Sequence, residues 1–157
     1  MRRVLAAAAA ILGVLALFAG KAPSIKSVAP VELAEWIRDR KPNLRVIDTR
    51  SEAEFEEYHL PRAERLTSAT TFAPDDTIVL VAGGSVSARN FYVLRGGVQA
   101  WIDEVMNPTI TASAPPSARA AYERASIVSR YFGGVPRIVD NVPATHVNAN
   151  AVRRRGC

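Results

Sequence analysis

The sequence predicts an α/β domain with an open parallel sheet and flanking helices, and three patterns support this. Two short apolar runs rich in β-branched residues, 44–47 and 78–81, are typical of strands buried in a parallel sheet. Residues 30–38 predict an amphipathic helix whose apolar stripe consists of Leu33, Trp36 and Ile37. Strands that alternate with helices in this way imply an α/β sheet.

The first twenty residues predict export. Met1-Arg2-Arg3 precedes 17 uncharged, mostly apolar residues from Val4 to Gly20, a pattern typical of a secretory signal. The cleavage site is weak, and 17 residues at about 1.5 Å each only just match a bilayer core of roughly 30 Å. A cleaved signal and an N-terminal signal-anchor that associates with the membrane therefore both stay open. In either case the positive-inside bias sends the remainder to the cell envelope, periplasmic or extracellular.

A second helix and a shortened connection follow. Ser51 can cap a helix that has Glu52 and Glu54 in its first turn, where the helix dipole favours acids. Further on, only the eight positions 83–90 separate Ala82 from the next strand, whereas a crossover between parallel strands needs roughly a dozen residues. We therefore predict that residues 85–89 form a stub without a crossover helix, so that the sheet face beneath is open or covered by something else.

Two blocks of residues resemble the opening and the close of the rhodanese-like family. The first block, 46–63, is an apolar strand followed by a short acidic helix and a His-Leu-Pro turn, and it matches the family at Asp48, Arg50, Glu54, Phe55, His59 and Pro61. Both glycines of the family pattern are replaced there, by Tyr58 and Arg62. The second block, 92–101, resembles the last core strand, its Gly96-Gly97 turn and the helix that contains Trp101.

This resemblance covers about residues 27–107 and implies a rhodanese-like open parallel sheet, a sulfurtransferase fold. It also implies that Asp48 and Arg50 form a hydrogen-bonded ion pair at a strand end, and that His59 belongs to a structural turn rather than acting as a base. Gly96, Gly97 and Trp101 are expected to be structural members of the closing block.

The reactive thiol of that family is missing. Sulfur transfer needs a thiolate held by amide donors, and Ala82 stands at the position of the nucleophile. Ser85 and Ser87 cannot form a persulfide. The segment Gly83-Gly84-Ser85 could still present backbone N–H groups to an anion, with Arg89 adding charge, and the alternative is a plain glycine turn.

The single cysteine, Cys157, is the remaining candidate catalytic group. It follows Arg153, Arg154 and Arg155, whose charge favours a thiolate. It could accept sulfur, form a mixed disulfide with a partner or bridge two chains, or it could be incidental to a solvated basic tail. One cysteine and the distant His59 and His146 are too few for a zinc site, so we expect no metal and no cofactor.

Charge is divided unevenly along the chain. Residues 21–104 hold 11 Lys and Arg against 13 Asp and Glu, whereas residues 105–157 hold 7 against 2. A basic tail outside the cytoplasm indicates anionic surfaces or partners. No basic stripe interleaved with aromatic residues is present, so we do not expect nucleic-acid binding.

The C-terminal part predicts a linker, 108–117, and a helix from 118 to about 131 that Ser117 caps and Gly133-Gly134 ends. Its apolar face would consist of Ala121, Tyr122, Ala125, Val128, Ser129 and Phe132. We expect this helix to dock on the domain, over the face left bare by the missing crossover, or on a protein partner. Beyond 134 the chain should be extended or mobile.

Three functional hypotheses follow. The first is an exported or membrane-anchored rhodanese-like protein, not a conventional sulfurtransferase, that acts as a binding module. The second is a sulfurtransferase or thiol-redox protein that uses Cys157. The third is a degenerate member with little independent function.

Overall fold

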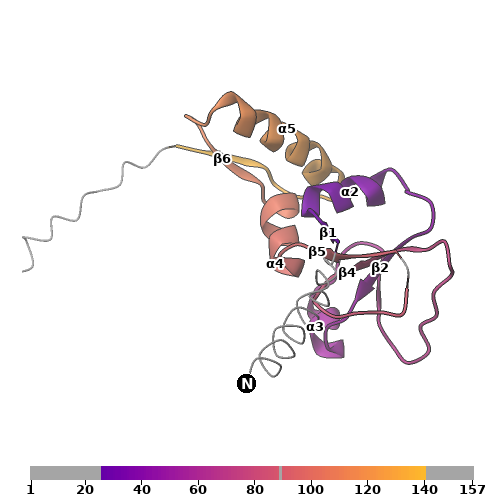
Figure 1. Cartoon of the computed structure of the whole chain (residues 1–157). Helices are drawn as coiled ribbons and strands as arrows, with labels where there is room; N and C mark the ends of the chain where they lie inside the picture. Colours follow the sequence, from indigo (N-terminus) through magenta and orange to yellow (C-terminus); the bar gives the residue numbers. More distant parts are fainter. Residues whose placement is uncertain (1–25, 89, 141–157) are drawn as a thin grey trace, which may run out of the picture.

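Five parallel strands form the central sheet of this computed structural model, which describes residues 26–88 and 90–140 (Figure 1). The strands are β1 (Ser27–Val28), β2 (Leu44–Asp48), β3 (Ala63–Arg65), β4 (Thr77–Leu80) and β5 (Phe91–Leu94). Their order across the sheet is β1-β5-β4-β2-β3, and every neighbouring pair runs parallel. The predicted α/β class is therefore confirmed.

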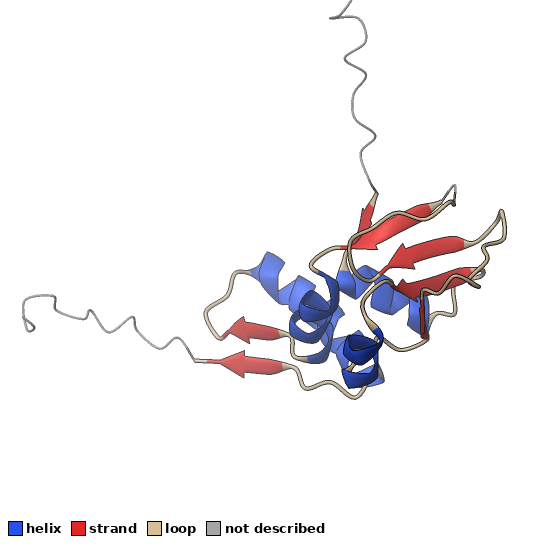
Figure 2. Cartoon of the chain, turned by 90° about the horizontal axis from the view of Figure 1, so that it is seen from below, coloured by secondary structure: helices blue, strands red, loops and turns tan. Residues whose placement is uncertain are grey.

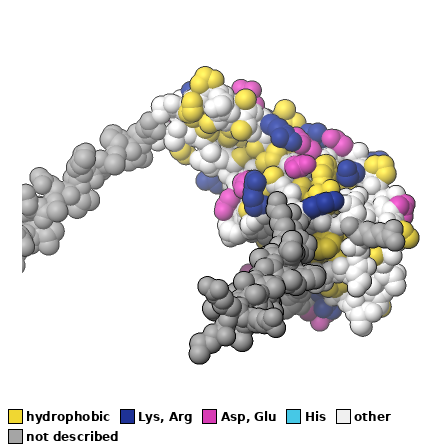
Figure 3. Space-filling view, viewed as in Figure 1, with side chains coloured by type: hydrophobic (Ala, Val, Ile, Leu, Met, Phe, Trp, Pro, Cys, Tyr) yellow, Lys and Arg dark blue, Asp and Glu magenta, His cyan; other side chains and the backbone are white. Residues whose placement is uncertain are grey.

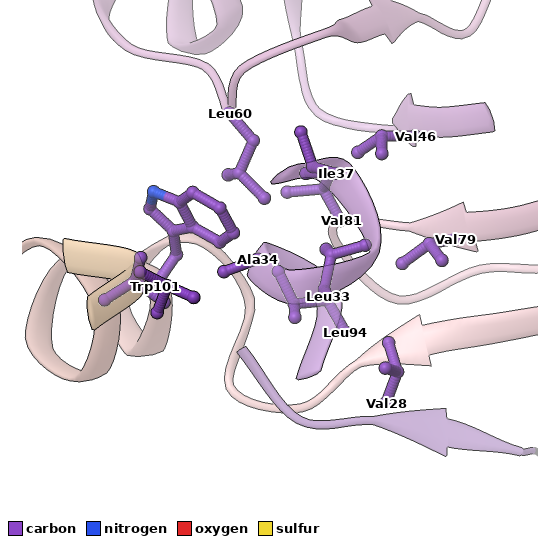
Figure 4. Close-up of a cluster of buried hydrophobic side chains, with 12 residues drawn as sticks. Val28, Leu33, Ala34, Ile37, Val46, Leu60, Val79, Val81, Leu94 and Trp101 are labelled. Carbon is purple, nitrogen blue, oxygen red and sulfur yellow. The ribbon is translucent and has the colours of Figure 1, made fainter. Parts of the chain in front are cut away.

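Most of the helical residues pack on one face of this sheet (Figure 2). The helices are α2 (Pro30–Arg38), α3 (Glu52–Glu57), α4 (Gly97–Trp101), the π-helical turn η1 (Ile102–Met106) and α5 (Pro116–Tyr131). The main hydrophobic core joins Leu33 of α2 and Trp101 of α4 to Val79 of β4, all fully buried. Figure 4 shows these side chains converging between the helices and the strands.

The cap predicted for the helix after β2 is confirmed. Ser51 Oγ accepts a hydrogen bond from the Glu54 backbone N–H at 3.4 Å, and the Glu54 carboxylate accepts one from the Ser51 N–H at 3.0 Å. This reciprocal capping box satisfies two amides that the helix itself cannot pair. The Ser51 hydroxyl also donates to the Glu54 carboxylate, and this bond together with the one from the Ser51 N–H lowers the pKa of Glu54.

The second face of the sheet is covered by loops. The connection between β4 and β5 contains no helix over residues 81–88 and 90, as the short spacing predicted. A loop suffices because each strand spans only about 13 Å, which ten residues can retrace. The face is nevertheless not open: Ile47, Ile78 and Leu80 are fully buried beneath side chains of two loops, namely Leu66, Phe72, Val86 and Ala88.

Helix α5 docks on the domain, but on the helical side of the sheet. It packs against α2 and η1, and its Val128 is fully buried in the main core. Arg124 of α5 donates to the Glu35 carboxylate of α2 from Nε at 2.6 Å, and this hydrogen bond lowers the pKa of Glu35. The prediction that α5 covers the face beneath the β4–β5 loop is wrong, because the loop's own Val86 and Ala88 cover that face.

Two details of the C-terminal prediction are corrected. Helix α5 begins at Pro116 without a side-chain cap, so Ser117 lies inside its first turn rather than at the cap. A proline suits this first helical position because its fixed φ matches the helix and its missing N–H has no partner to lose there. Within the predicted apolar face, Ala121 is exposed, whereas Ser126 is buried along with Ala125, Val128 and Ser129.

A small second sheet flanks α5. Strand β6 (Thr109–Thr111) lies within the segment predicted as a linker, and it pairs in parallel with β7 (Arg137–Val139) (Figure 2). The chain beyond 134 thus contains a strand where no regular structure was predicted. Helix α5 connects the two strands, so β6, α5 and β7 form one β-α-β unit.

Several predictions fall outside the described residues. The leader 1–20, Arg89, the basic run 153–155 and Cys157 all lie there. Among the helices that the structure describes, none has the length and apolar character that crossing a bilayer requires.

Candidate functional site at the carboxyl ends of β2 and β4

An ion pair occupies the carboxyl end of β2. Asp48 is fully buried, and its carboxylate accepts hydrogen bonds from the Arg50 backbone N–H at 3.0 Å and from Arg50 Nη2 at 2.6 Å. Arg50 Nη2 also donates to the Tyr58 carbonyl at 2.6 Å, which ties the end of α3 to the strand. The predicted strand-end pair of Asp48 and Arg50 is therefore present.

Because its guanidinium group is paired with Asp48, Arg50 has few free donors for a ligand. Its Nε and Nη2 atoms are both engaged by Asp48, and this hydrogen bonding raises the pKa of Arg50. A planar guanidinium held in this bidentate way is fixed in orientation. We interpret the pair as a structural brace that positions the neighbouring loop.

The loop after β4 starts at the predicted nucleophile position. Val81 is fully buried and its N–H donates to the Ile47 carbonyl at 2.9 Å, so the chain enters the loop in a fixed place. Ala82 follows, half-buried, with only a methyl group as its side chain. Thr49 Oγ1 then donates to the Gly83 carbonyl at 3.2 Å. Thr49 was not singled out from the sequence, and its place between Asp48 and Arg50 is the only signal for it.

The glycines of this loop leave its backbone accessible. Gly83, Gly84 and Ser85 are exposed, and Gly84 adopts φ 136°, a region that favours glycine. Within the described residues, the backbone N–H groups of 82–87 donate no hydrogen bond. Free amides of this kind are able to receive an anion. Ser85 and Ser87 are exposed, and neither hydroxyl is hydrogen-bonded to a histidine or a carboxylate in the described part of the chain.

The Gly96-Gly97 turn packs against the entrance of the loop. Both glycines have positive φ, 70° and 59°, and a Cβ atom at position 97 would lie 3.1 Å from the Val81 carbonyl oxygen. Position 97 therefore requires glycine for its conformation and for its close approach. The turn thus connects β5 to α4 beside the end of β4, as expected for the closing block.

Trp101 lies beneath this turn and is fully buried. Its ring meets Phe132 edge-to-face, with centroids 5.4 Å apart. Burial raises the pKa of Tyr58, and the adjacent Trp101 indole partly offsets that rise. The indole Nε1 nonetheless makes no hydrogen bond of ordinary geometry with the described residues. Trp101 therefore acts as a core residue that joins α4 to the end of α5.

His59 has a structural environment. Its ring stacks on Phe55 with centroids 4.2 Å apart, and its Nδ1 lies 2.9 Å from the Phe55 carbonyl oxygen. It is exposed, and both of these contacts are with Phe55 rather than with the loop after β4. This environment agrees with the interpretation of His59 as a turn residue.

The fit of Gly97 against the loop can be tested directly. Gly97→Ala should lower the free energy of unfolding by about 1–3 kcal/mol, because the new methyl meets the Val81 carbonyl in a strained backbone conformation. Gly83→Ala is the matched control, since no atom lies within 4 Å of its added methyl. Urea unfolding measures both. A Gly97→Ala effect no larger than that of Gly83→Ala would show that the turn does not pack on the loop.

Comparison with known proteins assigns no family to this site. No family model, no curated protein and no solved structure matches the chain. Within residues 26–88 and 90–140, no group of three His, Cys, Asp or Glu side chains is arranged to hold a metal ion.

Proposed function

We propose that this chain is a rhodanese-like domain that works by binding rather than by sulfur transfer. The observation that carries the proposal is Ala82, which lies two residues after the buried strand β4, at the position where the resembling family places its nucleophilic thiol. A methyl group can neither attack a sulfur donor nor hold a persulfide. The described residues contain no cysteine, since the only one in the sequence is Cys157.

Three features beside Ala82 support the rhodanese-like part of the proposal. The sheet is parallel throughout, Asp48 and Arg50 pair at the end of β2, and the Gly96-Gly97 turn packs on the entrance of the loop. The amides of 82–87, which donate to none of the described residues, support the binding part, because they suit an anionic group. The loop therefore offers backbone hydrogen-bond donors but no nucleophile.

We further propose that the domain acts at the cell envelope and meets a protein partner through α5. The charged start and apolar run of the leader support export. Ile127 and Tyr131, one helical turn apart, are 59% and 58% exposed on α5. Figure 3 shows hydrophobic side chains among charged ones on this side of the molecule.

A sulfurtransferase assay tests the proposal. With thiosulfate as donor and cyanide as acceptor, we expect no turnover above the protein-free rate, for the wild-type chain and for Cys157→Ala alike. Turnover that disappears in Cys157→Ala would favour the alternative of a sulfurtransferase that uses the terminal thiol. Turnover that persists in Cys157→Ala would refute the role assigned to the missing thiol.

A further inference from the structure

A hollow lies away from the loop after β4, where the ends of α2 and α5 meet the turn before β3. Its volume is about 550 Å³, and it is lined by Ile37, Arg40, Pro61, Arg62, Tyr131 and Phe132. This volume is within the range of roughly 300–1,000 Å³ typical of small-molecule sites. None of the lining residues was predicted as a site residue.

Arg40 lines this hollow from a backbone position that usually holds glycine. It follows the C-cap of α2 with φ 53°. Its N–H donates to the Ile37 carbonyl, and the next N–H, of Lys41, donates to the Trp36 carbonyl at 2.9 Å. These two bonds form a Schellman motif, whose left-handed residue is most often glycine because a Cβ atom is strained there.

Arg62 lines the hollow from a second position of this kind, with φ 63°. The resemblance described above places glycines at both 58 and 62. Tyr58 adopts φ −163°, an extended conformation open to any residue. Of the two replacements, only Arg62 places a side chain on a left-handed residue, where its Cβ atom is strained. Strain of this kind is often kept where the side chain has a function.

Both guanidinium groups are without a partner in the part of the chain that the structure describes. Neither takes part in an ion pair there, whereas five other arginines do: Arg38, Arg45, Arg50, Arg65 and Arg124. No acidic residue lines the hollow. Arg40 and Arg62 are thus exposed basic residues of a wall that contains no acidic residue among those described.

The rest of the wall is apolar and aromatic. Tyr131 and Phe132 lie edge-to-face with centroids 4.9 Å apart, and Ile37 and Pro61 complete the lining. Guanidinium forks bind the oxygens of a phosphate or sulfate, while aromatic rings bind a planar apolar group. The two kinds of lining together suit a ligand that has an oxyanion and a planar apolar group.

We propose that this hollow binds a small aryl phosphate or aryl sulfate ester, with Arg40 and Arg62 on the oxyanion and the Tyr131 and Phe132 rings on the aryl group. The site shares Tyr131 with the α5 surface proposed above but is separate from the loop after β4, so a failure to bind either ester would leave the proposed loss of sulfur transfer untouched.

Calorimetric titration of the full chain with phenyl phosphate and phenyl sulfate tests this proposal. We expect saturable binding of at least one ester, weakened about tenfold or more by Arg62→Gly and by Arg40→Gly, since each removes charged hydrogen bonds. The melting temperature of both variants should be no lower than that of the wild type, because glycine relieves the positive φ. Loss of binding is then separated from loss of folding.

Two matched variants serve as controls. Asn43→Gly removes another side chain at positive φ, 54°, outside the hollow, and Arg95→Gln removes an exposed charge elsewhere. Both should bind the ester as the wild type does. No saturable binding of either ester, or equal affinity in Arg62→Gly and wild type, would overturn the proposal. Inorganic phosphate or sulfate binding as tightly as its phenyl ester would overturn the aromatic part of the site.

Discussion

Val128→Asp is expected to lower the free energy of unfolding by at least about 4 kcal/mol, because it places an unpaired carboxylate in the main core. Val128 is fully buried where α5 packs on α2 and η1. Urea unfolding measures the loss. If the variant does not fold, Val128→Ala gives a graded result, with an expected loss of about 2 kcal/mol.

Ile127→Asp is the matched control for this prediction. Ile127 precedes Val128 on α5 and is 59% exposed, so the same substitution there should change the free energy of unfolding by less than about 0.5 kcal/mol. Similar effects at the two neighbouring positions would contradict the orientation of α5. A stable Val128→Asp variant would contradict its docking, and α5 would then be free to bind elsewhere.

Asp48→Ala is expected to cost about 3–5 kcal/mol of unfolding free energy, the range for removing one partner of a buried ion pair. Asp48 is fully buried and the Arg50 side chain is only 16% exposed, so the remaining guanidinium is left mostly desolvated. Chemical unfolding with denaturant gives the value for the single variant.

A second variant separates the charge effect from the loss of packing. Adding Arg50→Met to Asp48→Ala removes the uncompensated charge. The loss of unfolding free energy in the double variant should therefore be smaller, by at least about 1 kcal/mol, than the sum of the losses in the two single variants. Strictly additive losses would mean that Asp48 and Arg50 do not act as a pair. The structural role assigned to Arg50 would then be wrong.

The sheet and the cap of α3 could be predicted from the sequence because their signals are local, whereas the strand-end pair of Asp48 and Arg50 was expected from the resemblance to the rhodanese-like family. The apolar run at 44–47 lies in β2, the run at 78–81 overlaps β4 and extends one residue past it, and the capping residue Ser51 precedes α3 as predicted. The spacing of only eight positions between Ala82 and the next strand also predicted a connection without a helix. Each of these features depends on residues that are close together in the chain.

The placement of α5 could not be predicted in this way. Its apolar face indicates that it is covered, but both the far side of the sheet and the surface of α2 and η1 were available to it. The choice follows from Val86 and Ala88, which already cover Ile78 and Leu80, and from the ion pair of Arg124 with Glu35. These contacts join segments that are distant in sequence.

The hollow lined by Arg40 and Arg62 could not be predicted for a different reason. The resemblance shows that glycines are replaced at both 58 and 62, and the sequence alone does not tell which of the two replacements strains the backbone. Only the backbone distinguishes them, since φ is 63° at Arg62 and −163° at Tyr58. Short strands such as β6 and β7, with three residues each, likewise carry too little pattern to predict.

The central claim is that this domain has no sulfur carrier at the end of β4. Mass spectrometry of the full chain after incubation with thiosulfate tests it most directly, with the peptide from 77 to 88 compared before and after. We predict that this peptide gains no mass and that any added sulfur is confined to Cys157. A gain of one sulfur atom within 77–88, stable enough to pass to cyanide, would contradict the account.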